Sequence, residues 1–257
     1  MSGRPYILAE TNWDTVRKTR YDVAVLPWGA TEAHNYHLPY ATDTIQCDHL
    51  AALAAERAWK AGAKVTVLPT VPFGVQTGQL DIPLCINMNP STQMAVLGDV
   101  AESLAGQGIA KLVILNGHGG NDFRQMIREL QPEVDIFLSA VNWYRILDND
   151  AWFEEPGDHA GEMETSLMMQ FAPDLVSPLA DAGDGAERPS RIAAFREGWA
   201  WAPRQWTQVT EDTGVGNPRH ASGVKGQRFA EAVSERIASF LIELAAADPS
   251  NLYAETP

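Results

Sequence analysis

The sequence contains little cysteine and little positive charge. Only two of its 257 residues are cysteines, Cys47 and Cys85, which excludes a disulfide framework and favours the reduced thiols of a cytoplasmic protein. Its 19 lysines and arginines stand against 33 aspartates and glutamates, so the formal net charge is −14. Because nucleic-acid backbones and anionic lipid surfaces repel such a charge, we expect neither of them as a partner.

Long apolar runs are also missing. The longest, at residues 23–27 and 237–247, are far shorter than the roughly 20 apolar residues that cross a bilayer. The first residues, MSGRPYILAETNWD, lack the basic and apolar regions of a signal peptide. Hydrophobic residues still make up 45% of the chain, enough for a substantial core. We therefore expect a soluble, cytoplasmic protein in which residues 1–257 form a single domain.

Apolar, strand-like runs alternate with helix-like stretches. The runs predict strands at residues 21–27, 63–69, 109–116 and 134–144. Helical spacing predicts helices at residues 43–61, 90–106, 122–130, 162–170 and 222–247. This alternation is typical of an α/β protein, and we expect three α/β/α layers around a mainly parallel central sheet. Residues 181–218 show no clean period.

Histidines and acidic residues gather where the predicted strands end, and α/β sheets bind ligands there. The first cluster, GATEAHNYHLPYATD, follows the first strand. Glu32 and His34 are two residues apart, so in extended chain their side chains point to the same side. Such a pair can bind one or two metal ions, and Asp43 could bridge two ions with its two oxygens. Alternatively, Asp43 caps the next helix and the histidines, His37 among them, are surface residues.

The second cluster is NGHGGN, residues 116–121, directly after the third strand. Its glycines allow a tight turn, from which His118 can project toward the ends of the strands. A phosphate-binding loop would need a GxGxxG or Walker pattern, and neither is present. A plain turn between a strand and a helix stays open as the alternative.

The third cluster, GDHAGEMETS, contains Asp158, His159, Glu162 and Glu164. His159 can act as a general acid or base, because the pKa of histidine lies near neutrality. Glu162 can bind a metal, although acidic residues also favour the first turn of a helix for electrostatic reasons. Because Glu162 and Glu164 are two residues apart, a helix would point them in different directions.

These clusters, in this order, resemble the motifs of the creatininase (creatinine amidohydrolase) family. The motifs stand here as PWGATEAHNYHLPYATD (27–43), NGHGGN (116–121), HAGEMETS (159–166) and TGVGNP (213–218), and the resemblance spans about residues 27–226. It implies an α/β/α metal-dependent hydrolase of cyclic amides or formamides, with a dinuclear site at the strand ends. It also implies a homo-oligomer, a hexamer, to which Trp199, Trp201 and Trp206 could contribute an interface.

The resemblance further implies roles for individual residues. Glu32, Asp43 and His118 would hold one metal, and His34 and Asp43 the second, with Asp43 as the bridge. His159 would be the catalytic histidine, and Trp143 would lie beside the ring of the substrate. We expect Zn²⁺, with Mn²⁺ or Fe²⁺ as alternatives, at one or two ions per subunit.

The sequence departs from creatininase proper at the second metal site. Creatininase has a glutamate at the position of Gly120, and we expect Glu162 to supply that carboxylate, with Glu164 as the alternative ligand. Creatininase also has a glycine at the position of Asn35. These changes argue against creatinine itself as the substrate, and we expect another small, non-peptide amide.

Several alternatives stay open at this stage. Relatives with the same variant motifs include formamidopyrimidine deformylases and a peptidase that matures a peptide-derived cofactor. A catalytically silent metal- or ligand-binding scaffold is the alternative from another class, and Gly120 favours it. The sequence assigns no role to His37, His49 or His220.

Overall fold

The computed structural model describes residues 3–254. Residues 1–2 and 255–257 lie outside the described range, so the domain expected over residues 1–257 is described except at its ends. No helix within residues 3–254 is both long and apolar enough to cross a membrane.

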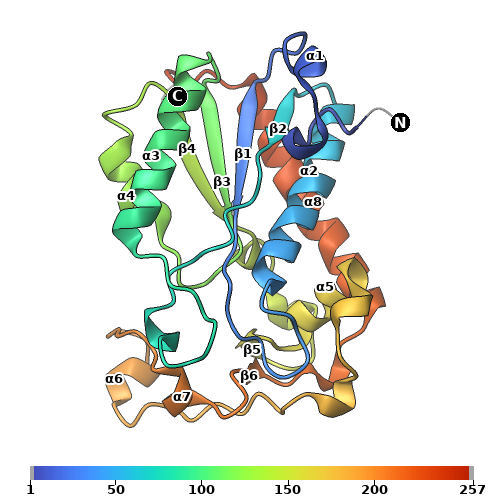
Figure 1. Ribbon diagram of the computed structural model, residues 1–257, viewed down its shortest axis with the longest axis vertical. Helices are drawn as coiled ribbons and strands as arrows, with labels where there is room; N and C mark the ends of the chain where they lie inside the picture. The colour runs from blue at the N-terminus through green and yellow to red at the C-terminus, as the bar shows by residue number, and fades with distance from the viewer. Residues whose placement is uncertain (1–2, 255–257) are drawn as a thin grey trace.

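Four parallel strands form the central sheet (Figure 1). Their order is β2-β1-β3-β4, with bounds β1 (Val23–Trp28), β2 (Val65–Val67), β3 (Lys111–Asn116) and β4 (Phe137–Asn142). A short antiparallel pair, β5 (Gly157–His159) and β6 (Val215–Gly216), lies beyond the carboxyl ends of these strands. The sequence predicted the four parallel strands but not the small pair.

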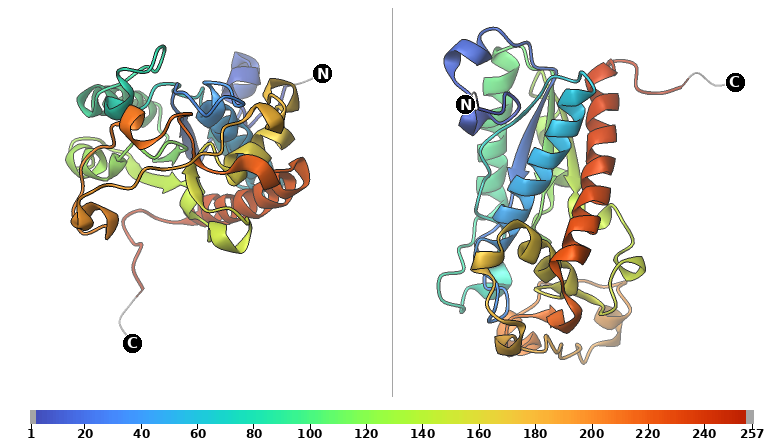
Figure 2. Two further views of the ribbon diagram at one scale, coloured as in Figure 1. Left: turned by 90° about the horizontal axis from the view of Figure 1, so that it is seen from below. Right: turned by 90° about the vertical axis from the view of Figure 1, so that its right-hand side faces the viewer.

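Helices cover both faces of the sheet (Figures 1 and 2). The longer helices are α2 (Thr42–Lys60), α3 (Pro90–Gly106), α4 (Phe123–Leu130), α5 (Glu162–Phe171) and α8 (Gly223–Ala246). Three single-turn helices complete the set: α1 (Trp13–Val16), α6 (Ala193–Arg196) and α7 (Trp206–Val209). Helices α2 and α8 pack on one face and α3 and α4 on the other, so the expected α/β/α layers are confirmed.

Successive strand residues feed two separate cores. Val25 of β1 and Val113 of β3 pack toward α2 and α8, whereas their neighbours Leu26 and Ile114 pack toward α3 and α4. The side chains of a strand alternate between the faces of a sheet, and strands buried on both faces are continuously apolar. All six residues of β1 and of β3 are accordingly buried.

The strand order fixes where a ligand can bind. The chain leaves β1 toward α2 on one face, and it leaves the neighbouring β3 toward α4 on the opposite face. In open α/β sheets, ligands bind at this reversal, outside the carboxyl ends of the strands. The loops after β1 and β3 carry Glu32, His34 and His118.

Candidate metal centre

The loop after β1 brings Glu32 and His34 together as the sequence predicted. Both side chains are buried, and His34 Nε2 lies 3.9 Å from Glu32 Oε1. The next residue, Asn35, has a φ of 54°, in the left-handed region that glycine and asparagine tolerate best. Asn35 is held by the Thr213 hydroxyl, which accepts its backbone N–H at 2.9 Å. Asparagine at position 35 therefore suits the left-handed backbone conformation of this loop.

Asp43 lies in the first turn of α2 and points into the same cluster. The residue at the helix N-cap is Ala41, which makes no side-chain cap, so the capping role considered for Asp43 is wrong. Asp43 is 1% exposed, and its Oδ1 is 3.0 Å from His34 Nε2. Its place at a helix N-terminus favours the charged carboxylate.

His118 is fixed by the asparagines of NGHGGN. Asn116 accepts the backbone N–H of His118 at 3.1 Å and donates to its carbonyl at 3.0 Å. Asn121 donates to Asn116 and accepts the backbone N–H of Val75 at 3.0 Å, which ties the His118 loop to the loop after β2. The sequence analysis assigned these asparagines no role, although the motif contained them.

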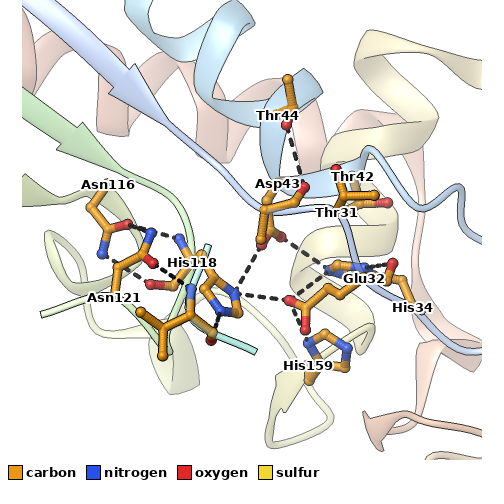
Figure 3. Close-up of polar contacts among 12 residues, drawn as sticks. Thr31, Glu32, His34, Thr42, Asp43, Thr44, Asn116, His118, Asn121 and His159 are labelled. Carbon is orange, nitrogen blue, oxygen red and sulfur yellow. Dashed lines mark hydrogen bonds and ion pairs between the residues drawn. The ribbon is translucent and has the colours of Figure 1, made fainter. Parts of the chain in front are cut away.

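Three histidines share one pattern of hydrogen bonding (Figure 3). His34 donates from Nδ1 to the carbonyl of Glu32 at 3.2 Å, and His118 donates from Nε2 to that of Val75 at 2.9 Å. His159 donates from Nε2 to the Ala33 carbonyl at 2.8 Å. Metal-binding histidines characteristically make such bonds, which fix the tautomer and leave the second nitrogen free. Here each second nitrogen faces a carboxylate.

The ligand atoms form two overlapping groups that share Asp43. Glu32, Asp43 and His118 make the first group; His34, Asp43 and Glu164 make the second. In each group the ligand atoms lie within 4.8 Å of one another. His159 lies close enough to Glu32 and His34 to form a third, overlapping group.

The second group contains Glu164 and not the expected Glu162. Helix α5 begins at Glu162, and residues two apart on a helix point about 200° apart. Glu164 Oε1 therefore lies 3.9 Å from His34 Nε2, whereas Glu162 faces away and forms an ion pair with Lys225. Glu162 also accepts the backbone N–H groups of Glu154 and Glu155 at 2.8 and 2.9 Å. Three donors of the fold itself, one side chain and two backbone N–H groups, thus bind this carboxylate.

Gly120 leaves no space for the glutamate of creatininase. A Cβ at this position would overlap the Val75 carbonyl oxygen and would lie 2.5 Å from His118 Nε2. The same two groups make the hydrogen bond that orients His118. The absence of a side chain at Gly120 is therefore coupled to the position of His118.

The buried carboxylates of the cluster favour positive charge beside them. Burial lowers the pKa of His34, but the carboxylates of Asp43, Glu164 and Glu32 outweigh this effect and raise it to about 10. Burial likewise opposes the charged form of His118, and Glu32 and Asp43 still raise its pKa well above the ordinary value. Asp43 Oδ2 lies 3.1 Å from His118 Nδ1 but accepts no well-aligned hydrogen bond within residues 3–254. Buried carboxylates grouped with imidazole nitrogens are the kind of donor set that suits a divalent metal.

His159 lies at the edge of the cluster and contacts two other rings. Its ring is tilted against that of His34 at a centroid distance of 4.2 Å and against that of Trp206 of α7 at 4.6 Å. Its Nδ1 is 3.8 Å from Glu32 Oε1, and the side chain is almost fully buried. Ala160, the next residue, has a φ of 51°, and its backbone N–H is accepted by Glu164. The third motif therefore places His159 and Glu164 together.

Trp143 does not line the site, which corrects the expected contact with substrate. It follows β4 as the first residue of a 3-10 helix, and its side chain is fully buried in the core beside α2. Its Nε1 has no hydrogen-bond partner within residues 3–254. The aromatic residue at the site is Trp206, which lies in the segment where the sequence showed no period.

The other histidines lie outside these groups. His37 is buried, and its Nε2 is 2.8 Å from the Thr165 hydroxyl. His49 stacks on Phe171, and His220 lies 3.8 Å from Glu155 near the surface. None of them belongs to a metal group found within residues 3–254.

Known proteins share both the sequence and the fold. A Mycolicibacterium smegmatis protein named mycofactocin precursor peptide peptidase is 28% identical over 222 residues, covering 82% of this chain and 81% of that protein. The creatinine amidohydrolase of Pseudomonas putida is 26% identical over 176 residues, covering 60% of this chain and 66% of the relative. Because one of these relatives is a peptidase, the comparisons do not confirm the expected restriction to non-peptide substrates.

Solved structures extend the similarity over nearly the whole chain. A Bacteroides fragilis protein, provisionally assigned as a creatinine amidohydrolase, superposes with a TM-score of 0.92 at 45% identity, covering 97% of this chain and 99% of that one. A manganese creatininase has the same fold, with a TM-score of 0.76 at 23% identity and coverage of 95% and 100%. The family model described as creatinine amidohydrolase matches residues 9–241. The chain therefore belongs to the creatininase family.

Proposed function

We propose that this protein is a metal-dependent hydrolase of an amide C–N bond. Glu32, Asp43 and His118 would hold one divalent cation; His34, Asp43 and Glu164 would hold the second. The observation that carries the proposal is the common orientation of the three histidines. Each has one N–H fixed by a backbone carbonyl and its other nitrogen aimed at the carboxylates.

A divalent cation held by these residues would supply a Lewis acid and would lower the pKa of water toward neutrality. The chain itself supplies the proton transfer. Because His159 donates its Nε2 proton to the Ala33 carbonyl, Nδ1 is the atom free to take up a proton and to release it to the leaving nitrogen. The rings of Trp206 and His34 both pack against the His159 ring, and these contacts restrict its rotation.

The substrate class we propose is an amide of cyclic, formyl or peptide origin. The chemistry of the site distinguishes none of these, because all three contain a C–N bond next to a carbonyl group. A cyclic amide or formamide is favoured by the family description, and a peptide by the similarity to the mycofactocin precursor peptide peptidase. Zinc or manganese as the metal, a homohexamer and a cytoplasmic location belong to the same proposal.

The alternative, a silent scaffold, loses its main support. It rested on the absence of a carboxylate at Gly120, and Glu164, grouped with His34 and Asp43, could supply that carboxylate. Activity without bound metal would contradict the proposed function, and metal without turnover of any substrate class would favour the scaffold.

The test compares purified wild-type protein with His118→Ala and with His220→Ala. The second variant is a matched control, because His220 is partly exposed and lies outside the metal groups. Elemental analysis should show that only His118→Ala loses metal. A panel of lactams, formamides and short peptides should be hydrolysed by the wild type and the control but not by His118→Ala. Unchanged metal content in His118→Ala would refute the ligand assignment. A light-scattering mass equal to that of a single chain would refute the hexamer.

A further inference from the structure

The two carboxylate oxygens of Glu32 have different surroundings. Oε1 faces the histidines, at 2.9 Å from His118 Nδ1 and 3.8 Å from His159 Nδ1. Oε2 points the other way and accepts a hydrogen bond from the side-chain amide of Gln79. A carboxylate held at one oxygen can rotate less, so the direction of Oε1 depends on Gln79.

Gln79 is held in turn by Cys85. The side chain of Gln79 is 1% exposed, and its amide oxygen accepts from the Cys85 thiol at 3.1 Å. The Cys85 sulfur itself accepts the backbone N–H of Ala33 at 3.3 Å. The backbone carbonyl of Ala33 accepts a hydrogen bond from His159 Nε2. Four hydrogen bonds therefore connect Glu32 to His159 through Gln79, Cys85 and Ala33.

The loop that carries Gln79 is fixed from its outer side. Gln79 ends a 3-10 helix, η2 (Thr77–Gln79), in which Gly78 lies directly against the backbone of Arg204. Asp81 accepts hydrogen bonds from Gln205 at 3.1 Å and from Thr207 at 2.7 Å. These residues flank Trp206, so the segment that covers His159 also holds the Gln79 loop in place.

We propose that Gln79 and Cys85 are positioning residues for this site. Gln79 directs Glu32 Oε1 toward the first cation, and Cys85 connects Gln79 to the peptide group that orients His159. Hydrogen bonds from an outer residue to a metal ligand typically change metal affinity by roughly 10–100-fold when they are removed. The inference rests on the proposed metal-dependent function and adds residues outside the family's four motifs.

The chain offers a matched control for Gln79. Gln76 is also a buried glutamine of the same loop, but its amide nitrogen has no hydrogen-bond partner within the described part of the chain. Gln79→Met and Gln76→Met remove the same groups from similarly buried positions, and only the first breaks the bond to Glu32. Cys85→Ala and Cys85→Ser form a second pair, because serine retains both the donor and the acceptor.

The test titrates Co²⁺ and Zn²⁺ into each protein after removal of metal with a chelator, and records the visible spectrum of the Co²⁺ form. We expect Gln79→Met to bind the first ion about tenfold more weakly and to show a changed Co²⁺ spectrum. Gln76→Met should match the wild type. In the metal-loaded Gln79→Met and Cys85→Ala variants, kcat should fall by a larger factor than KM changes. The kcat of Cys85→Ser should be close to that of the wild type.

The outcomes separate this inference from the proposed function. Wild-type protein that binds no metal overturns both. Wild-type protein that binds metal, with affinity and spectrum unchanged in Gln79→Met, overturns only the positioning role. If circular dichroism shows that Gln79→Met does not fold, the two variants of the partly exposed Cys85 test the inference instead. Equal kcat values for Cys85→Ala and the wild type would then overturn the positioning role of the connected hydrogen bonds.

Discussion

The His159 ring packs against the His34 ring in a tilted arrangement, at a centroid distance of 4.2 Å and an interplanar angle of 34°. Trp206 packs against His159 as well, with its ring centre 4.6 Å away. His34 belongs to the proposed second metal group, and His159 is the proposed proton donor. Any shift of α7 would therefore move the proton donor relative to the metal ligands.

Trp206→Leu should lower kcat/KM about three- to tenfold, because it removes an aromatic contact worth about 1 kcal/mol from one face of His159. The metal content should not change, since Trp206 contributes no ligand. Steady-state kinetics on the best substrate of the panel measures the effect. Trp201→Leu, in the same segment but 84% exposed, is the control. A loss of equal size in both variants would contradict a specific role for Trp206.

Glu164→Gln should abolish binding of the second cation and leave the first site occupied. The reason is that a neutral amide replaces one of the three ligands of the second group. Glu162→Gln should retain both cations, but it should unfold at lower temperature because Lys225 loses its buried partner. Metal titration and thermal unfolding of the two variants distinguish these roles. The reverse pattern, with the second cation lost only in Glu162→Gln, would restore Glu162 as the ligand.

Gly120→Ala should destabilise the protein by about 2 kcal/mol and weaken metal binding, because the added methyl group overlaps the Val75 carbonyl and the His118 ring. Gly119→Ala places the same methyl group in open space, with no atom of the described chain within 4 Å. Urea unfolding and metal titration of the two variants provide the comparison. Similar stability of both variants would show that the loop accommodates a side chain at position 120.

His37 should make the stability depend on pH. Burial, together with the positive charge of His34, lowers the pKa of His37 from 6.5 to about 4, although Asp212 acts in the opposite direction. Below pH 6.5 the unfolded chain takes up a proton that the folded protein does not, so stability present above pH 6.5 is lost as the pH falls toward 4.

Between pH 6.5 and 4, His37→Gln should lose less stability than the wild type, by on the order of 2 kcal/mol. Urea unfolding in the presence of a chelator measures this difference without a contribution from metal binding. Glutamine can retain the hydrogen bond to the Thr165 hydroxyl. Parallel pH profiles for the two proteins would contradict a lowered pKa at His37.

Sequence periodicity predicted the layers of this fold well, because long buried strands and helices leave a strong pattern. The continuous apolar run that became β3 and the 24-residue helix α8 are examples. The pair β5–β6 and helix α7 escaped prediction, since elements of two to four residues are too short to show a period. Their positions depend on contacts such as those between Gly78 and Arg204, which join distant parts of the chain.

The sequence also located most of the candidate site. Glu32, His34, Asp43, His118 and His159 meet in the structure because two loops follow neighbouring parallel strands and the third motif packs beneath them. Whether Glu162 or Glu164 faces the cluster depends on the direction in which each residue of α5 points. That direction depends on where α5 begins, and the sequence predicts the start of a helix only to within a residue or two. The role expected for Trp143 came from the family resemblance alone, and its side chain, in the 3-10 turn after β4, is buried in the core.

The tight packing around Gly120 also bears on how the ligand sets of this family diverge. A side chain at position 120 would meet the Val75 carbonyl, which also orients His118, so the neighbouring backbone would have to shift. A glutamate there therefore calls for a compensating change in the loop after β2. The effect of a substitution at one of these positions consequently depends on the residue at the other.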